Sequence, residues 1–192
     1  MFMNAFTRSE FLEGVLLAAG AGSRMGMPKA LVRDGEDSWL ARGVRVLAEG
    51  GCDAVTVVLG AAADEALPLL DGLGVDVVIA PDWAEGMSAS LRAGLDALPD
   101  EAEAAVVLLV DLPDVTAEVV RRVVADGAGP ADLSRAAYAG RPGHPVLLGR
   151  DHWAAVLGTS TGDHGARDYL ASAPTHEVEC GDLATGDDVD HR

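Results

Sequence analysis

The residues best suited to chemistry lie in one short segment, residues 15–31, which reads VLLAAGAGSRMGMPKAL. It holds three glycines, Arg24 and Lys29, the only lysine of the chain. Glycines allow successive backbone N–H groups to turn toward one anion, and the two side chains add full positive charges. Because the formal net charge is −17, solubility does not explain two cations beside a glycine-rich loop. The segment therefore predicts a loop that binds polyphosphate.

Two better-known phosphate-binding patterns fit this segment poorly. The dinucleotide fingerprint needs its third glycine one residue before Gly26, and the next apolar run ends in Gly60 rather than in a ribose-binding acidic residue. A P-loop places Gly-Lys-Ser/Thr at the start of its helix, where this chain has Gly-Met-Pro-Lys. A glycine turn without a ligand is the remaining alternative, and the full pattern directly after a strand disfavours it.

Asp111 is a candidate metal ligand. It follows the apolar run 105–110 and precedes Pro113, which prevents a strand from continuing. A carboxylate at the carboxyl end of a strand can hold Mg²⁺ against a triphosphate, because this cation takes one or two carboxylates plus phosphate oxygens. A helix N-cap is an equally good explanation from position alone.

The segment 86–90, Gly-Met-Ser-Ala-Ser, is predicted to open a helix. Its free N–H groups and the hydroxyls of Ser88 and Ser90 suit the polar groups of a base or ribose. N-capping by Ser88 is the competing interpretation.

Three further polar residues lie in the second half of the chain. His144 follows the turn 140–143, and a lone histidine is more often a bystander than a ligand. Asp163 and Arg167 flank the predicted start of a short helix. Arg167 is suited to bidentate phosphate binding, and a surface ion pair with Asp163 is the alternative.

The elements that must position these residues alternate between strands and helices. Strands are expected near residues 14–19, 54–59, 75–79 and 105–110, and helices near 38–49, 63–70, 87–97 and 117–125. Strands that are apolar on both faces and joined by helices predict an α/β fold with a doubly wound, mainly parallel sheet. Residues 132–148 predict a small β-rich insertion in the second half, followed by short helices near 151–157 and 168–171 and a strand near 175–178.

Length and composition limit the possible functions. The 192 residues are expected to form a single domain, 1–192. No apolar run approaches the length of a membrane span, residues 1–10 do not resemble a secretion signal, and Cys52 and Cys180 lie in no metal-like spacing. A cytoplasmic protein is therefore expected. The acidic charge argues against nucleic acid or a membrane as partner.

Residues 17–31 resemble the signature of the MobA-like NTP transferases, and within them the molybdenum cofactor (molybdopterin) cytidylyltransferases. The similarity continues through short motifs in the expected order, at 83–91, 109–113, 140–146, 162–167 and 188–190. The resemblance implies a Rossmann-like nucleotidyltransferase fold.

The resemblance also assigns roles to residues. It implies nucleotide binding by Leu17, Ala18, Ala19, Gly20, Ala21, Gly22, Ser23, Arg24, Lys29, Gly86, Met87, Ser88 and Ser90. It implies catalytic roles for Arg24, Lys29 and Asp111 and acceptor binding by His144, Asp163 and Arg167.

For the metal, the resemblance implies Asp111 and Asp190 as ligands. Asp190 matches the second position of an Asx-x-Asx motif, and Asp187 and Asp188 beside it leave the choice among the three open. The family usually continues with Thr-Pro and an acidic residue, whereas this sequence reads His-Arg there.

The activity implied is Mg²⁺-dependent transfer of CMP from CTP to a phosphate acceptor, molybdopterin or its molybdenum-loaded form, with release of pyrophosphate. A molybdoenzyme would receive the product. Ala19 stands where guanylyl-transferring relatives tend to carry glycine, which favours cytosine. The alternatives are guanylyl or other nucleotidyl transfer to molybdopterin or a sugar phosphate, and a non-catalytic cofactor-binding or delivery protein. Retention of Arg24, Lys29 and Asp111 together argues against the last of these.

Overall fold

The computed structural model describes residues 11–190, so the segment 1–10 examined for a secretion signal and the final His-Arg lie outside the described residues. The strands are β1 (Phe11–Ala18), β2 (Arg33–Asp34), β3 (Asp37–Ser38), β4 (Ala54–Leu59), β5 (Asp76–Ile79), β6 (Ala102–Leu109), β7 (Leu133–Tyr138), β8 (Arg141–Gly149) and β9 (His176–Glu179). The α-helices are α1 (Trp39–Glu49), α2 (Ala63–Ala66), α3 (Met87–Asp96), α4 (Ala117–Val123), α5 (Arg150–Thr159) and α6 (Arg167–Ser172). Short 3₁₀ helices cover Lys29–Leu31, Leu67–Leu70, Trp83–Glu85 and Gly162–His164.

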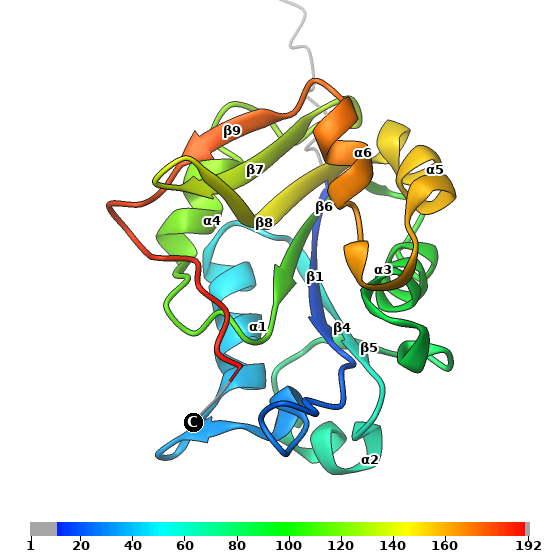
Figure 1. The fold of residues 1–192 in the computed structure, drawn as a ribbon, viewed down its shortest axis with the longest axis vertical. Helices are drawn as coiled ribbons and strands as arrows, with labels where there is room; N and C mark the ends of the chain where they lie inside the picture. The colour runs from blue at the N-terminus through cyan, green and yellow to red at the C-terminus, as the bar shows by residue number, and fades with distance from the viewer. Residues whose placement is uncertain (1–10, 191–192) are drawn as a thin grey trace, which may run out of the picture.

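Within residues 11–190, seven strands form one sheet in the order β5-β4-β1-β6-β8-β7-β9, which confirms the predicted fold class (Figure 1). Among the described residues, β8 is the strand of this sheet that runs antiparallel to its neighbours. The β-rich insertion is the hairpin of β7 and β8, and it extends the main sheet because β8 pairs with β6, with Val106 opposite Leu147. The strands β2 and β3 form a separate antiparallel pair.

Alternating side chains of β1 pack on opposite faces of the sheet. Leu16 and its even-numbered neighbours contribute to a core beneath α1 and α4, whereas Val15 and Leu17 contribute to a core beneath α3, α5 and α6. Figure 1 shows these two helical layers on either side of the sheet. Burying each such side chain stabilises the fold by about 1.5–3 kcal/mol, so this double-sided pattern fixes the register of β1.

Two helices illustrate how the local sequence sets their ends. Ser38 caps α1 by accepting a hydrogen bond from the Ala41 N–H at 3.5 Å, in agreement with the start expected near residue 38. The helix expected over residues 63–70 is instead α2 followed by a 3₁₀ turn. Pro68 explains the change, because it has no N–H to continue the α-helical ladder.

The order of the strands creates a crevice at one edge of the sheet. From β1 the chain moves outward to β4 and β5, and it then returns to β6 on the other side of β1. The loops after β1 and β6 therefore diverge, which is where ligands bind in open α/β sheets. No helix within residues 11–190 is long and apolar enough to cross a membrane.

Candidate active site

The glycine-rich segment forms a tight loop directly after β1. The Gly22 carbonyl accepts hydrogen bonds from the N–H groups of Met25 at 2.9 Å and Gly26 at 3.0 Å. Gly22 has φ of 60°, and a Cβ there would lie 1.9 Å from the Met27 carbonyl oxygen. Only glycine fits this position, so the sequence Gly-Ser-Arg-Met-Gly specifies the curl of the loop.

Lys29 lies in contact with two of the other residues predicted to be catalytic or metal-binding, Asp111 and Asp190. Its ammonium nitrogen lies 2.6 Å from Asp111 Oδ2 and 2.6 Å from Asp190 Oδ1. Arg24 Nη1 donates to the other oxygen of Asp190 at 2.7 Å. Lys29 comes from the loop after β1, Asp111 from the loop after β6, and Asp190 from the segment after β9, so the fold joins three distant parts of the chain.

The ion pairs hold these groups in their charged forms. The hydrogen bond from Lys29, followed by that from Arg24, lowers the pKa of Asp190 to about 2. Burial lowers the pKa of Lys29, but hydrogen bonds to Asp111 and Asp190 outweigh it and leave that pKa raised. At neutral pH Lys29 is therefore an ammonium and Asp190 a carboxylate.

A cluster of carboxylates lies at the same point. Oxygen atoms of Asp111, Asp188 and Asp190 all fall within 4.8 Å of one another. Asp187 is not part of this cluster and instead pairs with Arg141 at 3.1 Å. Three hard oxygen donors so close together fit a divalent cation such as Mg²⁺ or Mn²⁺.

A cavity of about 490 Å³ opens beside the glycine loop. Of the residues predicted to bind nucleotide, it is lined by Leu17, Ala18, Ala19, Gly20, Ala21, Gly22, Ser23, Arg24, Lys29, Gly86, Met87 and Ser90. Ser88 is the exception, because its side chain turns into the protein and its hydroxyl oxygen is buried. It does not cap α3 either, since Gly86 occupies the N-cap position.

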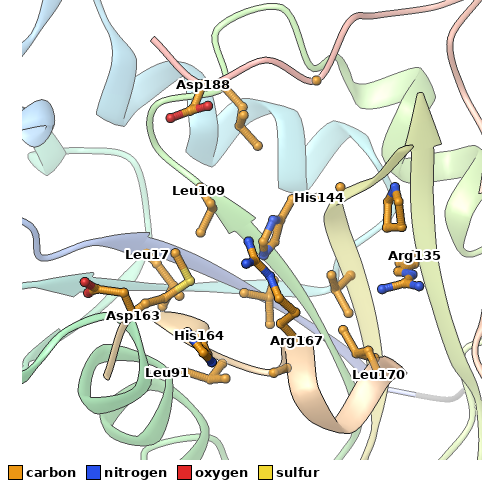
Figure 2. Close-up of a pocket in the computed structure, with 18 of the residues that line it drawn as sticks. Leu17, Leu91, Leu109, Arg135, His144, Asp163, His164, Arg167, Leu170 and Asp188 are labelled. Atoms are coloured by element: carbon orange, nitrogen blue, oxygen red, sulfur yellow. The ribbon is translucent and has the colours of Figure 1, made fainter. Parts of the chain in front are cut away.

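A second cavity of about 660 Å³ adjoins the first, and the three predicted acceptor-binding residues His144, Asp163 and Arg167 line it. Figure 2 shows the Arg167 guanidinium beside the His144 ring at the centre of this cavity. Burial, and then the charge of Arg167, lower the pKa of His144 to about 4, so its imidazole is neutral at pH 7. The two cavities share Leu17, Met87, Leu109, Asp111 and Asp163.

Some lining residues carried no signal in the sequence. Arg135 of β7 lines the second cavity and forms an ion pair with Glu177. The lining of this cavity also includes the apolar side chains of Leu91, Val146 and Leu170. Strand and helix periodicity place such residues in a core, and only the tertiary arrangement shows that this part of the core borders a cavity.

A mainly parallel sheet, with a glycine-rich loop and a cluster of carboxylates meeting at the crevice between β1 and β6, is typical of nucleotide-binding proteins of the phosphoryl-transfer class. Residues 14–178 match the MobA-like NTP transferase domain, and the chain belongs to this family of nucleotidyltransferases.

Known relatives cover most of the chain. It is 36% identical to the nicotine blue oxidoreductase of Paenarthrobacter nicotinovorans, over 92% of this chain and 91% of that protein. It is 34% identical to the molybdenum cofactor guanylyltransferase of Rhodobacter capsulatus, over 76% of this chain and 67% of that protein.

Solved structures agree with these relationships. A homologue of Mycobacterium tuberculosis Rv0371c from Mycobacterium sp. strain JC1 superposes with a TM-score of 0.83 at 32% identity, over 95% of this chain and 91% of that one. Rv0371c of M. tuberculosis in complex with manganese gives a TM-score of 0.74 at 28% identity, with 88% of each chain covered.

Proposed function

We propose that the protein is a cytidylyltransferase that transfers CMP from CTP to the phosphate of molybdopterin or its molybdenum-loaded form and releases pyrophosphate. The observation that carries the proposal is the junction of Lys29, Asp111 and Asp190 at the border of two adjoining cavities. One cavity has the glycine loop expected for a triphosphate, and the other has an arginine suited to a phosphate acceptor. Both open onto Asp111, which lies where two phosphates would have to meet.

In the proposed reaction, a phosphate oxygen of the acceptor attacks the α-phosphorus of CTP. The bond from this phosphorus to the bridging oxygen breaks, and pyrophosphate leaves with the electron pair. A phosphate monoester is largely deprotonated at neutral pH, so the attack needs no strong base. The work left to the protein is to align the two substrates and to neutralise negative charge.

Each group at the junction has a part in this alignment. The loop N–H groups and Arg24 hold the β and γ phosphates, and Lys29 stabilises the charge that develops on the α-phosphate. Arg167 binds the acceptor phosphate, and the neutral imidazole of His144 adds a hydrogen bond.

Asp111, Asp188 and Asp190 would hold the divalent cation, for which we propose Mg²⁺. When bound, this cation neutralises charge on the triphosphate. The oxygen-only set of donors supports a hard cation, and a homologous fold has been solved with manganese.

The choice of base is argued from Ala19. This residue lines the nucleotide cavity and is nearly fully buried, and we propose that its methyl group narrows the space for the base. A smaller space favours a pyrimidine over a purine. A relative named as a guanylyltransferase is 34% identical, so the family alone does not decide between CTP and GTP. We also place the protein in the cytoplasm, where the free thiols Cys52 and Cys180 stay reduced.

Pyrophosphate release tests the proposal. The purified protein is mixed with molybdopterin, Mg²⁺ and one of CTP, GTP, ATP or UTP, with the Lys29→Ala variant as the inactive control. We expect release with CTP that depends on molybdopterin. If GTP is the one triphosphate that gives release, the choice of base is wrong. If no triphosphate gives release, the assigned reaction is wrong.

A second candidate activity is the reduction of a heteroaromatic compound. The observation that favours it is the 36% identity with nicotine blue oxidoreductase across nine-tenths of both chains, together with the apolar wall of the second cavity. Bleaching of nicotine blue with NADH or NADPH as the electron donor would detect it. Hydride transfer has no need of the carboxylate cluster, so a reductase would keep its activity in Asp111→Asn, whereas a cytidylyltransferase would lose it.

A further inference from the structure

The loop after β6 and the segment after β9 are joined by one carboxylate, that of Asp114. Its Oδ2 accepts hydrogen bonds from the Thr185 N–H and from the Thr185 hydroxyl, each at 2.6 Å. Four residues later the Val189 N–H donates to the Asp111 carbonyl at 3.0 Å. The segment is thereby fixed to the loop at two points, and Asp188 and Asp190 lie on either side of the second point.

We propose that Asp114 and Thr185 form a clasp that positions Asp188 and Asp190 beside Asp111, which makes Asp114 a positioning residue of the metal site. The clasp is defined as the two hydrogen bonds between Asp114 and Thr185. This inference rests on the proposed function, because it takes the three carboxylates as the site of a divalent cation.

The segment needs such an anchor for two reasons. Residues 180–190 contain no helix or strand, so few backbone hydrogen bonds hold the path that brings Asp190 to Lys29. The three clustered carboxylates also repel one another, and Lys29 contacts only Asp111 and Asp190 among them. The Asp114 carboxylate takes two hydrogen bonds from Thr185, which lies three residues before Asp188. These bonds hold the segment in place and oppose the repulsion between the carboxylates.

Lys29 and Arg24 hold the Asp190 carboxylate itself, and the two ion pairs earlier in the segment are poorer anchors of its path. Asp187 pairs with Arg141, but both side chains are more than 60% exposed, and such pairs contribute little. Asp182 pairs with Arg122 eight residues before Asp190, whereas Thr185 lies only three residues before Asp188. Asp114 is partly buried, with its Oδ1 fully buried, although its partner Thr185 is exposed.

The second oxygen of Asp114 points to a role beyond stability. Asp114 Oδ1 is buried and has no hydrogen-bond partner among residues 11–190. Leaving a buried acceptor unsatisfied destabilises a protein, so this oxygen adds no stability of its own. Its position three residues after Asp111 allows one loop to carry both a metal ligand and the anchor for the other two.

Binding of Mn²⁺ in the absence of nucleotide, followed by electron paramagnetic resonance, tests the clasp without relying on activity. The variants are Asp114→Ala, Thr185→Val, which loses the hydroxyl, and Thr185→Ser, which keeps it. Asp182→Asn serves as a control on the same segment. We expect Asp114→Ala to weaken Mn²⁺ binding by roughly 10- to 100-fold, as for other groups that orient metal ligands. Thr185→Val should weaken it in the same direction, and Thr185→Ser and Asp182→Asn should bind as the wild type does.

The outcomes separate the clasp from the metal site itself. If the wild type binds no Mn²⁺, or if Asp111→Asn binds as well as the wild type, the proposed metal site is wrong. If the wild type binds and both Asp114→Ala and Thr185→Val bind equally well, the clasp is wrong. The clasp is also wrong if Thr185→Ser and Asp182→Asn lose as much Mn²⁺ affinity as Asp114→Ala does. Any substitution in the segment would then weaken Mn²⁺ binding, whether or not it removes the clasp. The Thr185 pair keeps the test decisive if Asp114→Ala fails to fold.

Discussion

The ammonium group of Lys29 lies 2.6 Å from a carboxylate oxygen of Asp190, although 161 residues separate the two along the chain. Asp111 approaches the same nitrogen equally closely from the other side. Lys29 thus connects the loop after β1 with Asp111 and Asp190, the two carboxylates that the proposed metal site requires.

Replacing Lys29 with alanine should lower the rate of pyrophosphate release by on the order of 10²-fold or more, because charge developing on the α-phosphate loses its partner. The variant should remain folded by circular dichroism. Arg92→Ala, which removes an exposed cation away from both cavities, is the matched control and should keep wild-type turnover. Unchanged turnover in Lys29→Ala would remove Lys29 from the mechanism.

Asp111→Asn should abolish metal-dependent turnover while nucleotide binding without metal survives. The amide keeps the size of the side chain but lacks the charge that a divalent cation and Lys29 both need. Calorimetric titration with CTP in the presence of a chelator, alongside turnover at ordinary Mg²⁺ levels, checks both statements. Persistent turnover would mean that the metal binds elsewhere.

With CTP and GTP at equal concentration, kcat/KM should favour CTP by roughly one to two orders of magnitude, the range available to a methyl-sized steric difference. Ala19→Gly, combined with substitutions at 86–90, should erode this preference, since the nucleotide cavity gains room. Competition kinetics measures both. Equal use of the two nucleotides would contradict the cytidylyl assignment and leave nucleotidyl transfer intact.

The depressed pKa of His144 should make the protein less stable in acid. Its folded pKa is about 4, below the ordinary 6.5, so the unfolded chain takes up the proton first as the pH falls. The contribution of the neutral imidazole is complete above about pH 6.5 and is lost as the pH falls toward 4. Urea unfolding of the wild type and His144→Gln at pH 7, 5.5 and 4.5 should show the shallower pH dependence in the variant. Parallel curves would refute the role of this histidine.

Gly86→Ala should destabilise the protein and disturb the border between the cavities. Gly86 has φ of 110°, and an added Cβ would lie 2.5 Å from Asp163 Oδ1 and 2.6 Å from the Gly162 carbonyl carbon. We expect a loss of about 1–3 kcal/mol in the free energy of unfolding from the strained backbone and the clash. Gly158→Ala in α5, where a Cβ meets nothing within 4 Å, should be neutral or stabilising by comparison. Urea unfolding of the two variants makes the comparison.

Much of this arrangement could be predicted because its signals are local. The apolar runs of β4 and β6 and the curl at Gly22 depend on neighbouring residues, so the sequence reveals them directly. The meeting of Lys29 with Asp111 follows from the parallel sheet, since the carboxyl ends of adjacent strands share an edge.

The rest depends on distant contacts. Asp188 was one of three candidates, and it joins the cluster because of the path that the segment takes past β6, while Asp187 turns to Arg141. Ser88 was expected at the nucleotide, but its place in the second position of α3 turns it inward. Which side chains of a helix face a cavity depends on how the helix packs against the rest of the protein, and local sequence patterns do not show this.

The division of the site into two cavities with one shared wall affects how this family can diversify. Apart from that wall, the second cavity is built mainly from residues 135–171, whereas the glycine loop and the start of α3 line the first. On the proposed function, substitutions in the second half of the chain can alter which molecule receives the nucleotidyl group while the loop that holds the triphosphate stays unchanged. The relatives named as an oxidoreductase and as a guanylyltransferase, at 36% and 34% identity, are the proteins in which to look for such a division.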